Sequence, residues 1–412
     1  MECPVGTLVL AVENDAERQA LLSDVALTSL QGLFTAVPDP RSRHGQRYPL
    51  TFLLTCLVAA LLCNCNSLAA TGQWCRLRQE VLARVFGRRR HLTPTGALYR
   101  WLLPRLAAEH VEAVLAAWVQ ATLHAPADEP LVADGKTVRG ARTAATPAPH
   151  LSSISTAHSQ ETLLHVRVAV KTNEISVLQA VLPALPVAGR VVLADALHMQ
   201  VATAAAIRAQ KGDYVLIVKD NQPALHDAIA LYFADPTSSS KTDATTDKGH
   251  GRLEHRLLTM TTTMTRSRAD GWPGLAQVGQ LIRTVTEHDV IRQETVSVIT
   301  SLKRSVAGPR RLLALIRAYW RSENSRPYVR DVTFGEDTSR LRTGAGPQIM
   351  AAFRNLALTL IHRQGATTIA DTRRFFAANP DQALTLLVSP PQNRTCGLHR
   401  IRLPGQPSRS IY

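Results

Sequence analysis

The sequence predicts an α/β protein: a mixed sheet with flanking helices, interrupted by a β-rich insertion and preceded by an all-helical N-terminal domain. Three observations support this fold class. Apolar residues recur at helical spacing through much of residues 1–125. Strand-like runs and one helical stretch follow between 131 and 222. More strand-like runs at 251–302 precede helical stretches at 309–325 and 347–363, and such mixtures of the two patterns are typical of α/β domains.

The composition is that of a large globular protein with an excess of basic residues. The chain has 412 residues, 45% of them hydrophobic, which allows a sizeable core and two or three domains. Its 47 Lys and Arg residues outnumber 32 Asp and Glu residues, so the formal charge is +15. Such an excess favours polyanionic partners: DNA, RNA or an anionic membrane surface.

The sequence indicates neither export nor membrane insertion. Its start lacks a basic leader before the apolar stretch. The most apolar run, 50–63, is shorter than the about 20 residues that cross a bilayer, and it predicts a buried helix. Cys63 and Cys65 lack the spacing of zinc ligands, and free cysteines beside such a helix behave as small hydrophobes. We expect a reduced cytoplasmic protein without structural zinc or membrane contact.

The N-terminal segment, 1–125, predicts helices within 15–35, 50–70 and 97–123. A basic stretch, RVFGRRRHL, lies at 84–92. Two interpretations stay open for this segment. It is a module that binds DNA ends, or it is a helical bundle with an ordinary solvated basic face.

The middle of the chain predicts the sheet. Strand-like runs occupy 131–134, 162–170, 175–182 and 190–195, a helical stretch covers 198–212, and DYVLIVKDNQ begins another strand at 213. This order is that of a ribonuclease-H-like domain, whose parts we assign to 126–233 and 303–365. The polar stretch 234–250 predicts a loop, and we assign 234–302 to the β-rich insertion and 366–412 to a C-terminal tail.

Three carboxylates stand in settings that favour a metal site. Asp134 and Asp195 follow apolar strand-like runs, and Glu323 lies in a helical stretch. Hard cations such as Mg²⁺ take oxygen ligands, and a metal pair stabilises the attacking and leaving oxygens of an in-line displacement at phosphorus. Aspartate is also common where strands end, and Asp331, Glu336 and Asp337 compete with Glu323 for the third position.

Several short motifs, in order, resemble those of the DDE transposases of bacterial insertion sequences, specifically the group that includes the H-repeat-associated proteins. They are VPDPRSRHGQRYPL, ADGK, KTNEI, the DA pair followed by Gln200, DYVLIVKDNQ, HGRLEHR, the IR-x-x-W-x-x-EN run, DVTFGED and RNLAL. The resemblance extends from about Leu30 to Leu360. Each motif alone is weak, and their common order is what makes the resemblance specific.

The resemblance implies a ribonuclease-H-like core with the insertion between the second Asp and the Glu. It also implies that Asp134, Asp195 and Glu323 are the catalytic and metal-binding triad for two Mg²⁺ ions, with Mn²⁺ as a substitute. The implied activity is the cutting of double-stranded transposon ends and their joining to target DNA by a homodimer on DNA, in the cytoplasm at the nucleoid. Two rivals remain: a nuclease of the same fold without strand transfer, and a catalytically impaired DNA-binding protein derived from a transposase.

Basic residues near the carboxylates are candidate DNA contacts, because the fork of arginine suits phosphate. The alternative is that they neutralise the acidic cluster when no metal is bound. His158 and His250 are left out of the catalytic set, and Glu254 is expected in a cross-strand ion pair. The candidates for DNA contact are Lys136, Arg139, Arg142, Lys219, Gln222, Arg317, Arg321 and Arg330.

One position departs from the family pattern. The family usually has a His-Trp pair where this chain has Pro327 and Tyr328. Proline inside a helix leaves a carbonyl without its donor and costs about 3 kcal/mol. The sequence therefore predicts either a kink just after Glu323 or a helix that ends near Arg326.

Overall fold

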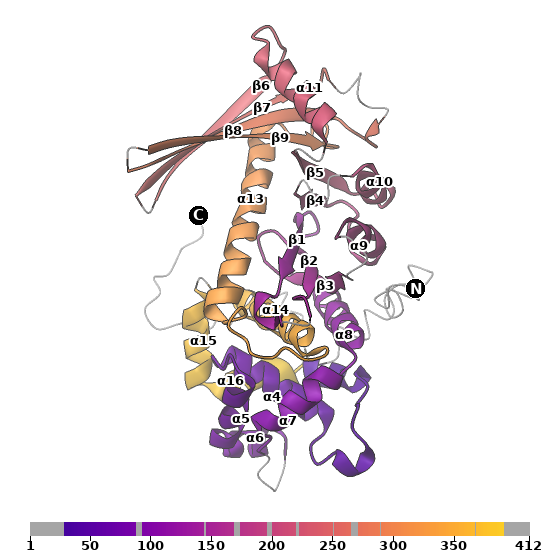
Figure 1. Ribbon diagram of the computed structural model, residues 1–412, viewed down its shortest axis with the longest axis vertical. Helices are drawn as coiled ribbons and strands as arrows, with labels where there is room; N and C mark the ends of the chain where they lie inside the picture. The colour runs from indigo at the N-terminus through magenta and orange to yellow at the C-terminus, as the bar shows by residue number, and fades with distance from the viewer. Residues whose placement is uncertain are drawn as a thin grey trace.

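A mixed nine-stranded sheet runs through the described part of the computed structural model (Figure 1). The structure describes residues 29–390 apart from 88–92, 144–145, 169–173, 196–199, 220–221, 250, 265–270, 289 and 367. The strands are β1 (Leu131–Thr137), β2 (His150–Thr156), β3 (Thr162–Val168), β4 (Val191–Ala194), β5 (Asp213–Val218), β6 (Lys241–Gly249), β7 (Arg252–Thr261), β8 (Gln277–Glu287) and β9 (Val290–Thr300).

The sheet has the order β3-β2-β1-β4-β5-β9-β8-β7-β6. Strands β1, β4 and β5 are parallel to one another, whereas β2 and β3 form an antiparallel hairpin beside β1. Strand β9 joins β5 in the antiparallel direction, and β8, β7 and β6 continue outward from it. The strands expected at 251–302 are therefore confirmed, and they extend the same sheet edge to edge.

Helix α13 (Pro309–Tyr328) covers one face of this sheet. Its apolar residues share a core with Val132 of β1, Val191 and Leu193 of β4, and Val215 and Ile217 of β5. Helices α9 (Glu174–Val181) and α10 (Val201–Ala209) contribute Leu178 and Ile207 to the core on the opposite face. Figure 1 shows α13 running from the β6–β9 end of the molecule to the helical end.

The helical end combines segments from both termini of the described chain. It contains α3 (Leu30–Leu33), α4 (Leu50–Leu62), α5 (Leu68–Leu77), α6 (Gln79–Val85), α7 (Gly96–Leu102), α8 (Ala108–Ala121), α14 (Gly346–Arg363), α15 (Ile369–Ala378) and α16 (Pro380–Val388). The apolar run at 50–63 is confirmed as a buried helix, α4. Among the described helices, none is both long and apolar enough to span a bilayer.

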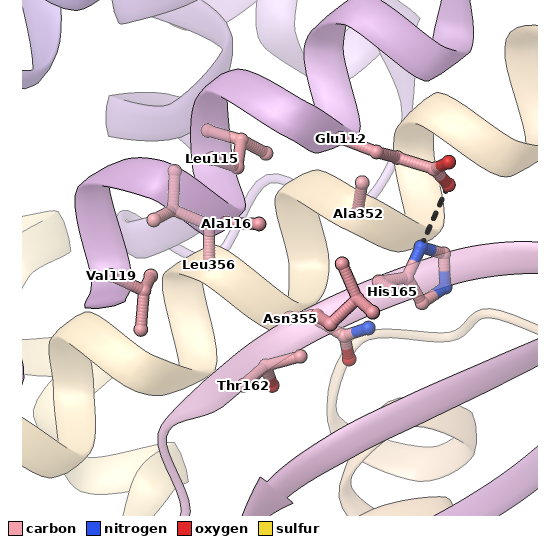
Figure 2. A pocket seen from close by; sticks show the side chains of 10 residues that line it. Glu112, Leu115, Ala116, Val119, Thr162, His165, Ala352, Asn355 and Leu356 are labelled. Carbon is pink, nitrogen blue, oxygen red and sulfur yellow. Dashed lines mark hydrogen bonds and ion pairs between the residues drawn. The ribbon is translucent and has the colours of Figure 1, made fainter. Parts of the chain in front are cut away.

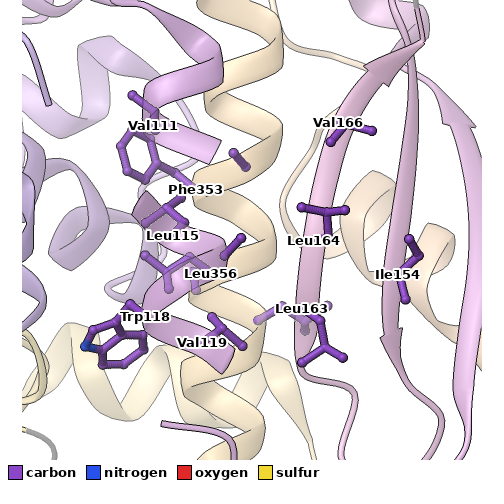
Figure 3. Packing of buried hydrophobic residues seen from close by; sticks show 14 of the residues in the cluster. Val111, Leu115, Trp118, Val119, Ile154, Leu163, Leu164, Val166, Phe353 and Leu356 are labelled. Atoms are coloured by element: carbon purple, nitrogen blue, oxygen red, sulfur yellow. The ribbon is translucent and has the colours of Figure 1, made fainter. Parts of the chain in front are cut away.

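Helix α8 and strand β3 pack tightly against α14, as Figure 3 shows. Trp118 and Leu115 of α8, Phe353 and Leu356 of α14, and Leu164 of β3 are buried in one cluster. The N-terminal helices consequently share their core with the sheet and with α14. Since burial of apolar area provides most of the driving force for folding, we do not expect residues 1–125 to fold alone.

A polar group is buried where α8, β3 and α14 meet (Figure 2). The Oε1 atom of Glu112 lies 2.9 Å from Nδ1 of His165, and its Oε2 atom accepts a hydrogen bond from Gln348. Burial raises the pKa of Glu112, while the hydrogen bond from His165 opposes that shift. The adjoining cavity of about 20 Å³ is large enough for one water molecule. These contacts hold the helical layer to the sheet.

Three assignments from the sequence are wrong. Residues 175–182 are not a strand, because 174–181 form α9, where Val177, Leu178 and Val181 are buried at helical spacing. The expected loop at 234–250 contains strand β6, and β2 was not recognised. The segment 366–412 is not wholly a tail, because α15 and α16 pack against α4.

His362, near the end of α14, makes stability depend on pH. Burial, and then the nearby charge of Arg326, lower the pKa of His362 from 6.5 to about 4. A histidine with a lowered folded pKa stabilises the fold fully above pH 6.5 and loses that contribution as the pH falls towards 4. We expect the free energy of unfolding to drop by about 1–3 kcal/mol in this window because of His362.

The measurement is urea unfolding of wild type and His362→Gln from pH 7 to pH 4. The variant should lose part of the pH dependence in that window. Equal slopes for the two proteins would show that His362 does not titrate as its burial indicates.

Candidate active site

Asp134 and Asp195 lie on the same face of the sheet, towards α13. Side chains alternate between faces along a strand, and Val132 and Leu193 both pack in the core beneath α13. Asp134 and Asp195 each follow two residues later, so they share that face. The register that pairs Val132 with Leu193 would, if continued, place Asp134 beside Asp195. Alternation and strand pairing together thus bring two carboxylates to one point.

Glu323 is carried to the same place by α13. Leu312, Ile316 and Tyr319 are buried against the sheet, and Glu323 follows Tyr319 by one helical turn. The side chain of Glu323 is exposed at the surface. Partial desolvation and the negative charges of Asp134 and Asp195 raise the pKa of Glu323, whereas Lys219 opposes this shift. Glu323 is therefore near enough to Asp134 and Asp195 for their charges to act on it.

The same three carboxylates also affect the pKa of Tyr319. Burial raises the pKa of its hydroxyl group, and the charges of Glu323, Asp195 and Asp134 raise it further. Tyr319 lies one turn before Glu323 on α13, and it was not singled out from the sequence.

The three carboxylates have the donor chemistry that a divalent cation requires. Mg²⁺ takes oxygen ligands, and mutual repulsion among Asp134, Asp195 and Glu323 is the condition that a bound cation would relieve. Within the described residues, no three side chains of the His, Cys, Asp or Glu type lie close enough to hold a metal together. The carboxylates must therefore approach one another more closely to share an ion.

Arg326 anchors α13 just after Glu323. Its Nη2 atom donates hydrogen bonds to the carbonyl of Gln160 at 2.9 Å and to the hydroxyl group of Thr162 at 3.0 Å. Burial lowers the pKa of Arg326 to about 10, and the charge of Asp134 opposes that shift. This buried arginine ties the helix that carries Glu323 to the β2–β3 hairpin.

A second buried cluster surrounds Glu336. Its Oε2 atom lies 2.7 Å from Nη2 of Arg330 and 3.1 Å from Nζ of Lys136, and its Oε1 atom accepts a hydrogen bond of 3.4 Å from Arg354. Lys136 also pairs with Asp331. Burial opposes ionisation here, but the three cations hold the pKa of Glu336 at about 2. Glu336 is thus a counter-ion inside the protein, which disfavours it as the third metal ligand.

Pro327 does not end the helix. Helix α13 continues to Tyr328, so the expected end near Arg326 is wrong. A π-helix, Val329–Thr333, follows directly, and the N–H of Phe334 donates to the carbonyl of Val329 at 3.0 Å. Such wider turns commonly occur next to functional sites.

The expected DNA contacts fall into four groups. Arg139 and Arg142 are exposed and line an open cleft beside β1. Lys219, Arg317 and Arg321 line a second cleft that ends at Glu323. Gln222 is half-buried at the N-terminus of α11 (Pro223–Ala234). Lys136 and Arg330 both pair with the buried Glu336, so we do not propose them as DNA contacts.

Other candidates have structural settings. The backbone N–H of His158 donates to Glu129, and His250 lies outside the described residues. Glu254 forms the expected cross-strand ion pair with Arg283. Arg354, the buried partner of Glu336, could have been recognised from the sequence. A charged residue in the middle of an otherwise apolar helix requires a buried counter-ion.

Comparison with known proteins identifies the family. The family described as "Transposase DDE domain" matches residues 126–360, and the one described as "DDE_Tnp_1-associated" matches residues 32–119. "Putative transposase YncI" of Escherichia coli O157:H7 is 26% identical over 345 residues, which is 82% of this chain and 88% of that protein.

A second relative is "H repeat-associated putative transposase YhhI" of Escherichia coli strain K12. It is 26% identical over 253 residues, which is 58% of this chain and 65% of that protein. Among solved structures, a piggyBac transposase synaptic complex with hairpin DNA aligns with a TM-score of 0.37 at 10% identity, covering 93% of this chain and 80% of that one. On the match over residues 126–360, the chain belongs to the DDE transposase family, in the group that includes the H-repeat-associated proteins.

Proposed function

We propose that the chain cuts the ends of an insertion sequence and joins them to target DNA at a site formed by Asp134, Asp195 and Glu323. The observation that carries this proposal is the placement of the three carboxylates, which come from distant parts of the sequence. The β1–β4 register sets Asp134 and Asp195 on the sheet face that α13 covers, and Glu323 lies one turn after the buried Tyr319 of α13. Three carboxylates gathered on one sheet face of a basic DDE-family protein suit phosphodiester chemistry.

The proposed frame for this site is a ribonuclease-H-like core. It comprises β1–β5, in the order β3-β2-β1-β4-β5 with β2 antiparallel to its neighbours, together with α13. Strands β6–β9 enter the chain between Asp195 and Glu323, where the β-rich insertion was expected.

The proposed reaction has two displacements at phosphorus. In the first, the oxygen of water forms a bond to phosphorus at the element's end, and the bond from phosphorus to the 3′ oxygen breaks. The leaving 3′ oxygen gains a proton as water loses one. In the second, that 3′-hydroxyl oxygen loses its proton and bonds to a phosphorus of target DNA, and a target 3′ oxygen leaves and gains a proton. No covalent bond to the protein forms.

The residues of the site have separate proposed roles. Asp134 and Asp195 at the strand ends and Glu323 on α13 would hold two Mg²⁺ ions, or Mn²⁺ as a substitute. When bound, such ions activate water and neutralise charge on the reacting phosphate. Arg326 keeps α13 in position, and Lys219 supplies a positive charge beside Glu323.

We also propose that end recognition involves the N-terminal helical segment, 1–125, and that a homodimer brings two ends together on DNA. Because this segment shares its core with α14, its role is best tested in the full chain. Gel shifts on the element's own ends and on scrambled duplex should differ. Equal affinity for both would show that the full chain does not recognise the ends.

A strand-transfer assay tests the proposed function. Labelled ends incubated with target DNA and Mg²⁺ should give joined products. Cut ends without joined products would favour a nuclease of the same fold. Binding to DNA without any cutting would favour an impaired, transposase-derived DNA-binding protein.

DNA binding should weaken steeply as salt rises. Each neutralised phosphate contributes about −0.9 to the slope of log K against log[salt] on B-DNA. With a formal charge of +15, contacts to about 6–10 phosphates imply a loss of ~10³ or more between about 50 and 200 mM salt. Fluorescence anisotropy on a labelled duplex measures this slope. A nearly flat response would rule out the basic surface as a DNA-binding surface.

A further inference from the structure

A polar cleft of about 390 Å³ begins at Glu323 and continues across the face of β7 and β8. Its lining contains three acidic residues, which are Glu254, Glu294 and Glu323, together with Trp320 of α13. Its cationic residues are Lys219, Arg252, Arg256, Arg283, Arg317 and Arg321. Cations therefore outnumber carboxylates along the cleft by two to one.

The cleft is the outward continuation of the face beneath α13. Leu258 of β7 and Leu281 of β8 pack in the core under that helix. Arg256 precedes Leu258 by two residues, and Arg283 follows Leu281 by two. Both arginines therefore lie on the same face of the sheet as these leucines. The face thus changes from apolar to arginine-rich where it passes beyond α13.

Arg256 and Arg283 lie directly opposite each other on β7 and β8. Like charges in such a pair destabilise a sheet. Glu254 offsets this repulsion, since Arg256 lies 2.6 Å from its Oε1 atom and Arg283 also pairs with that atom. Glu254 is only 6% exposed, so its ion pairs with the two guanidinium groups are largely shielded from solvent.

Contacts also fix side chains on the side of the cleft that α13 forms. Arg317 pairs with Asp247 of β6 at 2.7 Å, which holds α13 to the edge of the sheet. The guanidinium group of Arg283 lies over the ring of Trp320, 5.8 Å from its centroid. Arg252 and Arg321 are exposed at the cleft. Fixed arginines of this kind suit phosphate, because little side-chain freedom remains to be lost on binding.

We propose that this cleft holds the phosphates of the DNA strand that leads to the scissile bond, with the exposed Arg252 and the partly exposed Arg283 as its contacts on the sheet. Glu254 is a positioning residue that arranges these arginines. The assignment rests on the proposed function, and it gives β6–β9 a direct part in binding the substrate.

The test is the salt dependence of DNA binding by the full chain, without divalent metal, on a labelled random-sequence duplex. Arg252→Ala and Arg283→Ala should each weaken binding and make the slope of log K against log[salt] shallower by about 0.9. Arg283→Lys keeps the charge and should keep the slope. Arg310→Ala removes an exposed arginine at the start of α13, outside the cleft, and is the matched control.

The outcomes separate this inference from the proposed function. If Arg252→Ala and Arg283→Ala change the slope no more than Arg310→Ala, the cleft is not the phosphate site, even where wild type cuts DNA. If the two variants lower the slope but wild type never cuts DNA with Mg²⁺, the cleft stands and the proposed activity fails. A wild-type protein that does not bind duplex DNA overturns both.

Discussion

Glu323→Gln should lower DNA cleavage by orders of magnitude while it leaves DNA binding without metal near the wild-type level. The change keeps the size of the side chain but removes a charge that would hold the metal. DNA affinity comes chiefly from the basic residues, and these are untouched. Single-turnover cleavage of labelled ends and a parallel gel shift measure the two effects.

Asp337→Asn is the matched control for the loss of one carboxylate in the neighbourhood. Asp337 lines the cleft that contains Arg139, whereas Glu323 lines the other cleft. The control should keep much of the activity. If Glu323→Gln cuts well and Asp337→Asn is inactive, the third ligand has been assigned to the wrong residue.

Glu336→Gln should destabilise the fold by about 3–5 kcal/mol, because it leaves Arg330 and Arg354 buried without their counter-ion, whereas Lys136 keeps Asp331. From the sequence alone, we would expect Glu336→Gln to have little effect. The burial of Glu336 makes a large loss of stability the expected result. The low pKa of Glu336 adds a pH effect, since stability from this carboxylate is present above its unfolded pKa and is lost as the pH falls towards about 2.

Urea unfolding of wild type and Glu336→Gln measures this change. Asp371→Asn removes one partner of the exposed ion pair with Arg374 and should cost only about 0–1 kcal/mol. Similar losses in the two variants would show that the cluster around Glu336 is not a buried network.

Asp134 and Asp195 could be found from the sequence because strand alternation decides which face a residue occupies. Each follows a short apolar run that must be buried, so its position at a strand end follows from the pattern. Glu323 depended on the resemblance, since glutamate is common on solvated helix faces. The long helices α13 and α14 were predicted because their apolar residues recur over several turns.

Other features left no usable local pattern. Strand β6 is polar and exposed along most of its length, since it is an edge strand, and so it lacks the alternation that marks a half-buried strand. In α9, Ile175, Val177 and Val181 are β-branched residues that favour strands, but its packing against α10 makes it a helix. The pairing of Lys136 and Arg354 with Glu336 depends on tertiary contacts between separate segments.

The central claim is that Asp134, Asp195 and Glu323 together form one metal site. A crystal structure of the protein with DNA ends and Mn²⁺ tests it most directly, because anomalous scattering locates the ions. The account predicts Mn²⁺ density in contact with carboxylate oxygens of all three residues, and no such density at Glu323 in the Glu323→Gln variant. Mn²⁺ held instead by Asp331 or Asp337, in a protein that still cuts DNA, would contradict it.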